Sequence, residues 1–449
     1  MAAPPAPRSA TRASTATRTR TVVKQSGLGL FARVGSMLLT FITLPLLLQA
    51  LGARELGVWL VLASVFHWIA HMDFGVASGA RNEIAKAAAA RDTEQVQTAT
   101  ITGWICTTAI ALLLATVGTF LLTYGRGAMW LETNVFGGVS ARLPLLIVLL
   151  GACTNFSISF VQTVYAAHER PAVASAASLL VNLSFLAATI VVVQLGIGSL
   201  AIICWAYVAC LIATNSALFF RFLQHFQIPQ PLLASFHRPL ARRVVGFGLR
   251  LFVVQLSAMM IFTTSRLLVG LFEGPEAVVV YDAGYKVFFL VSSAHSLVMA
   301  SLWSSYTHAI TVHDWDWVRS TLRKLRLLTL PLAALCLMLA WISPWLISHW
   351  LGDSNVGSVS LYVWMAIATI FGCWSNVFAY FLNGIGDVNV QMRSSIIAAC
   401  LFLPGTYLFA VILNYGTVGV VVSTALATSV FSVVGPIRTQ QLITQRMGK

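Results

Sequence analysis

The sequence predicts an all-α polytopic membrane protein with 12 transmembrane helices in two related six-helix bundles. Three features lead to this prediction: the composition, the number of long apolar segments and a likeness between the two halves. Of 449 residues, 58% are hydrophobic and 9% charged, whereas a soluble domain carries about 25% charged residues. So much apolar surface is stable only against lipid. The apolar runs are continuous rather than alternating, so they are expected to be helices and not barrel strands.

The elements follow from the length of each apolar run. A helix that crosses the hydrocarbon core needs about 20 mainly apolar residues. Segments of this kind are expected at 27–50, 56–79, 98–123, 142–166, 172–195, 199–221, 244–270, 278–306, 327–350, 358–383, 394–413 and 417–438. The longest inner connection, 222–243, is expected to be a cytoplasmic linker between a bundle at 26–221 and a bundle at 244–440.

The two ends of the chain differ from the spans. Residues 1–25 contain five basic residues, no acid and many Ala, Ser, Thr and Pro. They lack the short apolar core of a signal peptide. A disordered basic cytoplasmic tail is therefore expected, with a transit peptide as the alternative. Residues 441–449 are expected to form a second cytoplasmic tail.

The distribution of positive charge predicts the orientation. With the N-terminus in the cytoplasm, 21 of the 28 Lys and Arg residues fall in inner segments, and only Arg54, Arg126 and Arg142 in outer ones. Cytoplasmic loops carry such an excess, so both termini are predicted to be cytoplasmic. The same bias accounts for the net charge of +14 without nucleic acid as a partner. The seven cysteines lie in apolar runs without a CxxC pair, and they indicate neither disulfides nor a zinc site.

The two halves resemble each other at their first outer turn. LLLQALGARELGVW joins the first two spans and LLVGLFEGPEAVVVY joins spans seven and eight. Aligning Glu55 with Glu276 places a short turn and then an aromatic residue, Trp59 or Tyr281, in similar positions. Parallel six-helix repeats in transporters have this form, so the halves should superpose by rotation about the membrane normal.

The second span contains HWIAHMDFG, residues 67–75. His67 and His71 are four residues apart and share one helix face, and Asp73 is expected near the inner surface. Three interpretations remain open: polar residues at the interface, a gate or proton-linked coupling site, and a metal site. The metal site lacks further ligands in the adjacent sequence.

Four basic residues lie inside spans: Arg33, Arg250, Arg266 and Lys286. Charged side chains at membrane depth are costly and usually face a bundle interior or a water-filled cavity. Arg33 and Arg250 are close to the inner ends of their spans, where snorkelling to the headgroups is the alternative.

Arg266, Asp282 and Lys286 form the strongest candidate site. Asp282 and Lys286 follow the outer turn four residues apart, and Arg266 precedes it. Antiparallel neighbouring helices would bring the three to similar depth, with a net positive charge. An anion site, a structural ion pair and outward snorkelling all fit. We expect Arg33, Arg266 and Lys286 to face one water-filled cavity.

Uncharged polar residues also recur at helical spacing. Asn155 lies on one face of the fourth span with Ser159 and Gln162, and Asn376 on one face of the tenth with Tyr380 and Asn383. Such residues either hydrogen-bond neighbouring helices or bind substrate. Asn155 and Asn376 are the candidates for substrate binding.

LGARELGVW followed by DFGVASGARNEIAKAAAARD resembles the start of bacterial polysaccharide and O-antigen flippases. These belong to the multidrug/oligosaccharidyl-lipid/polysaccharide exporter superfamily. The likeness consists of a Leu-Gly turn at 51–52, a Gly-aromatic pair at 57–59 and Asp-x-Gly at 73–75, before a charged inner loop. In topology it covers about 26–440.

The resemblance implies a V-shaped pair of bundles around a central cavity. It implies alternating access that carries an undecaprenyl-pyrophosphate-linked oligosaccharide across the bacterial inner membrane, for polysaccharide or O-antigen export. In relatives, cavity arginines are thought to hold the pyrophosphate or acidic sugars. The sequence departs from many relatives at Arg266, where they have an acidic residue, which puts an ion-coupling role of this helix in doubt.

The expected partners are the lipid-linked oligosaccharide, membrane lipids, and polysaccharide polymerase and assembly proteins. No cofactor, metal or catalytic residue is expected. The alternatives are a multidrug or organic-ion exporter of the same superfamily, an integral-membrane glycosyltransferase or polymerase, and a scaffold in an assembly complex. An exporter of organic cations would favour acidic cavity groups, but the first span offers Arg33. A glycosyltransferase needs carboxylates on large outer loops, whereas the longest, 124–141, has only Glu132.

Overall fold

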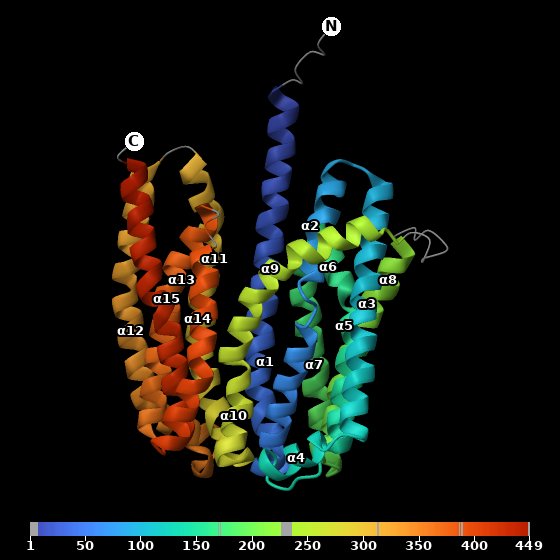
Figure 1. Cartoon of the computed structure of the whole chain (residues 1–449), viewed down its shortest axis with the longest axis vertical. Helices are drawn as coiled ribbons and strands as arrows, with labels where there is room; N and C mark the ends of the chain where they lie inside the picture. Colours follow the sequence, from blue (N-terminus) through green and yellow to red (C-terminus); the bar gives the residue numbers. More distant parts are fainter. Residues whose placement is uncertain are drawn as a thin grey trace.

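The computed structural model describes residues 8–168, 170, 172–225, 236–311, 314–385, 387 and 389–447, which form helices without any strand (Figure 1). In chain order the helices are α1 (Arg8–Ala70), α2 (Val76–Ala89), α3 (Thr93–Thr123), α4 (Gly127–Asn134), α5 (Arg142–Ile158), α6 (Phe160–Ala167), α7 (Ala172–Leu195), α8 (Leu200–His225), α9 (Arg238–Phe262), α10 (Thr264–Glu273), α11 (Pro275–Thr311), α12 (Trp315–Leu351), α13 (Val359–Ile385), α14 (Asn389–Thr406) and α15 (Gly416–Met447). A 3₁₀ turn (Asp353–Asn355) follows α12 and a π-helical segment (Tyr407–Ile412) follows α14.

The helices form two halves, α1–α8 and α9–α15, and run between two ends of the molecule (Figure 1). The turn end carries the reversals at Gly52, Gly274 and Gly352; the terminal end carries both termini. Eleven helical stretches in the described residues are long and apolar enough to cross a membrane. The first, Gly27–Ala70, has 44 residues and contains the first predicted span and the larger part of the second, as far as Ala70. Every predicted span therefore has a counterpart, and the predicted all-α fold is confirmed.

The first reversal of each half is made by a single glycine. Gly52 has φ 71° and ψ 170°, and Gly274 has φ 87° and ψ 175°. A residue with a Cβ rarely adopts such a conformation, so glycine is required at both positions. Aligning Gly52 with Gly274 keeps Trp59 opposite Tyr281 and shifts the Glu55–Glu276 alignment by one residue.

The second span differs from the prediction because its helix is interrupted. A continuous helix was expected at 56–79, but α1 ends at Ala70 and α2 begins at Val76. Between them Gly75 adopts φ 77°. The Asp73 carboxylate accepts hydrogen bonds from the backbone N–H of Gly75, at 3.0 Å, and of Ala77, at 2.9 Å. A carboxylate that satisfies free N–H groups at a helix start stabilises a new helix there.

Three segments expected outside the bundles are partly helical. α1 begins at Arg8, so a helix occupies most of the segment 1–25 for which disorder was expected, and residues 1–7 lie outside the described part. α8 and α9 extend into the expected linker 222–243, of which 226–235 is not described. α15 continues through the expected tail 441–449 as far as Met447.

The two halves are joined at the turn end. α1 packs on α7 within its own half and on α11 of the other half. Gly57 lies directly against α11, because a Cβ there would be 1.8 Å from the carbonyl oxygen of Pro275. Phe41 of α1 stacks on Trp350 of α12 with ring centroids 5.0 Å apart. The contact between the halves at this end is therefore close and leaves no room for a larger residue at position 57.

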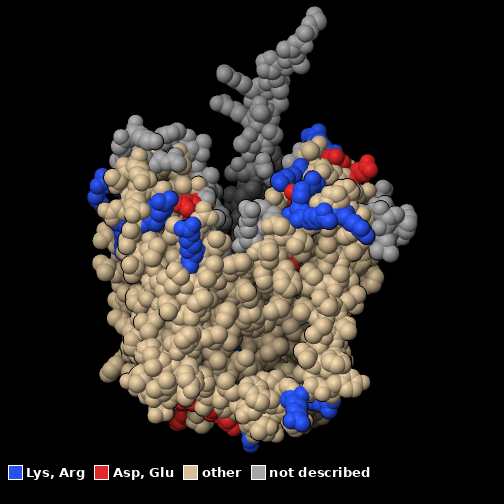
Figure 2. Space-filling model, in the orientation of Figure 1, with Lys and Arg blue, Asp and Glu red and all other residues tan. Residues whose placement is uncertain are grey.

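At the terminal end the halves are separated. Figures 1 and 2 show the two bundles apart there, with the surface hollowed between them. α9 crosses from the first half to the second, and a Cβ on Gly79 of α2 would lie 2.1 Å from the Val244 carbonyl oxygen of α9. On the face in Figure 2, the described Lys and Arg side chains gather mostly at the terminal end. The space between the halves that opens at this end is called the cleft below.

Candidate functional site

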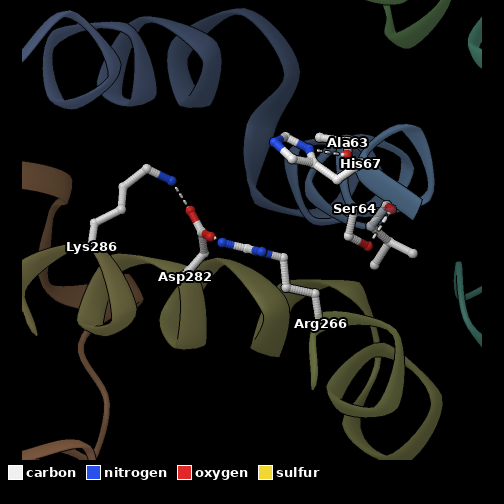
Figure 3. A network of polar contacts seen from close by, with 7 residues as sticks. Ala63, Ser64, His67, Arg266, Asp282 and Lys286 are labelled. Carbon is white, nitrogen blue, oxygen red and sulfur yellow. Dashed lines mark hydrogen bonds and ion pairs between the residues drawn. The ribbon is translucent and has the colours of Figure 1, made fainter. Parts of the chain in front are cut away.

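The Gly274 turn brings Arg266 of α10 next to Asp282 and Lys286 of α11 (Figure 3). The Arg266 Nε–H donates a hydrogen bond to Asp282 Oδ1 at 2.7 Å. The Lys286 ammonium donates to the other oxygen, Asp282 Oδ2. The three residues singled out in the sequence thus form one cluster, in which a single carboxylate bridges two cations.

This cluster is almost completely buried. The Asp282 side chain is 0% exposed, and those of Arg266 and Lys286 are 19% and 13% exposed. Desolvating charges is costly, and the loss is recovered only when the hydrogen bonds are well made. Two cations and one anion leave one net positive charge, held on the side chains that remain partly accessible.

An aromatic ladder on α11 supports Arg266. Its guanidinium lies over the Tyr285 ring, 4.9 Å from the centroid, in a cation–π arrangement. Tyr285 is itself stacked between Tyr281, at 6.2 Å, and Phe289, at 5.6 Å. The site predicted from the sequence did not include Tyr285. The four-residue spacing of the three aromatic residues was the available signal.

His67 lies near the end of the second helical part of α1, and His71 follows directly after it; both belong to the first half of the molecule. Each Nδ1 contacts the carbonyl oxygen four residues earlier: His67 meets Ala63 at 2.8 Å, and His71 meets His67 at 2.9 Å. The two rings are nearly parallel, with centroids 6.4 Å apart. His67 interacts electrostatically with Arg266, and Figure 3 shows its ring on the side of the cluster. The first half therefore adds imidazoles to a site whose charges come from the second half.

Asp73 lies in the helix break between α1 and α2, which follows the two histidines in the chain. It is buried, and both carboxylate oxygens accept backbone hydrogen bonds at the start of α2. Gln255 of α9 donates to the His71 carbonyl oxygen at 3.3 Å, so it connects the same region to the other half. The sequence did not indicate Gln255, because it is an isolated amide that does not belong to a series of polar residues at helical spacing. In the described residues no group of three or more His, Cys, Asp or Glu side chains could hold a metal ion.

Arg33 lies between the halves at another depth. Its Nε–H donates to Ser175 Oγ of α7 at 3.3 Å, and it interacts electrostatically with Tyr380 of α13. Nineteen helical residues separate it from Gly52, about 28 Å at 1.5 Å per residue, whereas Asp282 is eight residues, about 12 Å, from its own turn. Arg33 is thus not part of the cluster and lies nearer the terminal end. The Arg250 side chain is outside the described part.

The two asparagine candidates hydrogen-bond between helices. Asn155 is buried in the first half and accepts from Asn215 Nδ2 at 2.7 Å, and the oxygen of Asn215 accepts from Gln162 Nε2 at 2.7 Å. Asn376 Nδ2 donates to Ser296 Oγ at 3.3 Å, which links α13 to α11. Both amides therefore have protein partners on neighbouring helices.

The sequence matches two models of known protein families. The model of the family described as "Polysaccharide biosynthesis protein" matches residues 22–303, and the MatE model matches residues 251–408. No curated protein sequence matches the chain.

Solved structures share the fold at low identity. One is described as the inward-facing conformation of a multidrug resistance MATE family transporter of the MOP superfamily; it has a TM-score of 0.77 and 15% identity, over 94% of this chain and 99% of that one. A MOP superfamily transporter from Pyrococcus furiosus, whose description states that a binding pocket of reverse polarity suggests a different function, has a TM-score of 0.69 and 14% identity, over 95% and 96% of the two chains.

The family model spans more than half of the chain and crosses from the first half into α11. The chain belongs to the polysaccharide biosynthesis protein family, within the MOP superfamily of membrane transporters.

Proposed function

We propose that the protein is a flippase for a lipid-linked oligosaccharide joined to its lipid, undecaprenol, through a pyrophosphate. It would move this cargo across the bacterial inner membrane by alternating access, for polysaccharide or O-antigen export. The observation that carries the proposal is the Arg266–Asp282–Lys286 cluster, a buried site with a net positive charge that faces His67 of the other half.

The chemistry of the cargo fits such a site. A pyrophosphate cannot enter hydrocarbon unpaired, because isolated charge is strongly disfavoured there. In the cluster, Arg266 uses Nε for Asp282, so its two terminal amino groups are the part that can meet phosphate oxygens. The planar fork of arginine binds such oxygens in pairs, and a lysine adds a point charge.

The shape of the molecule supports transport by alternating access. The halves are closed against each other at Gly57 and Pro275 and separated at the terminal end. With the termini in the cytoplasm, as the charge bias favours, the cleft opens toward the side from which the cargo is loaded. Arg33, nearer the opening, would meet an anionic head group before the deeper cluster does.

A multidrug or organic-ion exporter is the second candidate, because the matched structures include transporters described as multidrug resistance proteins. Binding of organic cations favours an exposed carboxylate in the cleft. Here Asp282 is fully buried and both its oxygens are bound by cations. The electrostatics therefore favour an anionic cargo.

Deletion of the gene followed by analysis of lipid-linked saccharides tests the proposal. Loss of a flippase should leave full-length lipid-linked units on the cytoplasmic leaflet, whereas loss of a glycosyltransferase would leave truncated ones. Normal lipid-linked units combined with hypersensitivity to organic cations would instead support the multidrug candidate.

Substitution of Arg266 then tests the site. Arg266→Ala should reduce transport by about tenfold or more, since a hydrogen bond to a charged group contributes about 1.5–3 kcal/mol. Arg266→Lys should restore part of it, because it returns the charge without the fork. Arg126→Ala, at the turn end, is the control. Transport that survives Arg266→Ala and Arg33→Ala together, at normal protein level, would contradict a cationic cargo site.

A further inference from the structure

His67 has one ring nitrogen fixed by the backbone and one that makes no such contact, on a ring that faces the Arg266–Asp282–Lys286 cluster. Its Nδ1 lies 2.8 Å from the Ala63 carbonyl oxygen, which can only accept a hydrogen bond. Nδ1 must therefore carry a proton, and in the neutral ring Nε2 is the unprotonated acceptor. Figure 3 shows the ring on the side where Arg266, Asp282 and Lys286 lie, and no protein hydrogen bond to Nε2 is found among the described residues.

The charges around His67 come mainly from the opposite half. The charged groups that interact with His67 are His71 of α1 and Arg266 of α10. Arg266 contacts Asp282 and Tyr285 of α11, Asp282 binds Lys286, and Tyr281 stacks on Tyr285. Tyr207 of α8 packs on Phe66, the residue before His67. α7 carries no charged or titratable side chain, and Arg142 of α5 and His349 of α12 lie at the turn end. With Asp282 held between two cations, the cluster presents His67 with a net positive charge.

A bound anion reverses this balance. An anion beside Arg266 cancels the excess positive charge and offers an acceptor that Nε2–H can reach only when the ring is protonated. A neutral His67 would instead place its lone pair against the anion's oxygen, which is repulsive. The same ring therefore opposes anion binding when neutral and supports it when charged.

We propose that His67 is a proton-dependent anion contact, which takes up a proton at Nε2 when a phosphate-type anion binds to Arg266 and Lys286 across the cleft. The proposal rests on the proposed anionic cargo and adds a coupling between cargo and protons. In this proposal both halves contribute to the anion site, because Arg266 and Lys286 belong to the second half and His67 to the first.

Proton uptake by purified protein on addition of sodium sulfate tests the proposal. Sulfate is a phosphate-type anion whose own charge stays constant between pH 5.5 and 8, so any proton uptake belongs to the protein. A pH-indicator dye in weakly buffered solution reports the uptake, and radioactive sulfate in equilibrium dialysis reports binding. An upward shift of about one pH unit in the His67 midpoint would give uptake of about half a proton per molecule near that midpoint.

Matched variants locate the proton. His349→Gln is the control, since His349 makes the same Nδ1 contact to the carbonyl four residues earlier, with Trp345 at 2.9 Å, but lies at the turn end. Uptake should persist in His349→Gln and vanish in His67→Gln. His67→Lys, which fixes the positive charge, should bind sulfate without uptake and with little dependence on pH.

The outcomes separate this inference from the proposed function. Unchanged uptake in His67→Gln, or Arg266-dependent sulfate binding without any uptake in the wild type, would overturn the role of His67 and leave the anion site intact. Sulfate binding that is unaffected by Arg266→Gln would remove the anion site, and the proposed function with it.

Discussion

The hairpin at Gly52 in the first half and the hairpin at Gly274 in the second reverse the chain in the same way. Their glycines have φ 71° and 87° and ψ 170° and 175°. In each half an acid next to the turn also holds the start of the last helix. Glu55 accepts from the Leu200 N–H of α8 at 3.1 Å, and Glu273 accepts from the Thr417 hydroxyl of α15.

The same hairpins differ in the side chains at equal distance from the glycine. The second half has Arg266 eight residues before the turn, Asp282 eight after it and Lys286 twelve after it, where the first half has Leu44, Leu60 and Ser64. The three residues of the first half are buried: the two leucines belong to the main hydrophobic core, and Ser64 Oγ donates to the Val61 carbonyl oxygen at 2.7 Å.

This difference separates the part of the repeat that both halves share from the part that only one half has. The turns and their helix-end acids are shared, because both halves must reverse and close in the same geometry. The charged cluster is confined to one half, so the hairpin geometry does not require it. The proposed anion binding would therefore be asymmetric in a nearly symmetric scaffold, and the following four changes test that contrast.

Leu60→Asp should have the largest effect, since it places the Asp282 carboxylate in the first half without its cations. Leu60 is buried in the core, and an unpaired buried charge costs about 5 kcal/mol. The yield of monodisperse protein should fall to near zero in size-exclusion chromatography. Adding Leu44→Arg and Ser64→Lys should restore part of it, and a stable Leu60→Asp single variant would show that the first half tolerates charge as well.

Asp282→Asn should destabilise the protein by about 3–5 kcal/mol, because two buried cations lose their shared partner. Thermal unfolding in detergent measures the loss. Asp387→Asn is the control, since its ion pair with Arg438 at the terminal end is more exposed, with side chains 14% and 34% accessible. Equal losses of stability in the two variants would mean that the buried cluster contributes no more than a more exposed ion pair.

Gly57→Ala should cost about 1–3 kcal/mol, the typical penalty for overpacking a closed contact. The added methyl group would meet the Pro275 carbonyl, so the variant should favour states in which the turn end is open. Labelling of cysteines introduced at that end measures the shift. Gly372→Ala, at a helical glycine with open space, should change neither quantity. Unchanged labelling in Gly57→Ala would argue against closure at this contact.

Arg54→Ala should have the smallest effect, within about 1 kcal/mol, because exposed ion pairs contribute little. Arg54 and Glu276 join the two hairpins at 3.8 Å, but their side chains are 57% and 55% exposed. The melting temperature should change little, and added salt should erase the difference. A loss as large as that of Asp282→Asn would show that this surface pair, and not the buried cluster, holds the hairpins together.

The sequence predicted each crossing because length and hydropathy are local properties. It did not predict the break at 71–75, which depends on the Asp73 side chain capping a new helix instead of facing the membrane surface. It also could not show that a single glycine would suffice for the reversal at Gly52. Nothing in composition distinguishes a one-residue turn from a loop of several residues.

The candidate site was predictable to the extent that it lies on one hairpin. Arg266 and Asp282 are equally far from Gly274, so antiparallel helices bring them together. The position of His67 opposite Arg266, and the contact of Gln255 with His71, depend on how the halves pack, which no local pattern contains. The different depth of Arg33 also follows only from tertiary packing.

The position of Gly274 midway between Arg266 and Asp282 has a consequence for biosynthesis. An arginine or aspartate at the centre of a helix entering the bilayer alone costs about 2.5–3.5 kcal/mol. α10 and the start of α11 leave the ribosome as neighbours, joined by one residue, so Arg266 and Asp282 can pair as a helical hairpin before the rest of the second half is made. These two charges could therefore enter the membrane already neutralised, and the glycine turn allows their insertion as well as their final geometry.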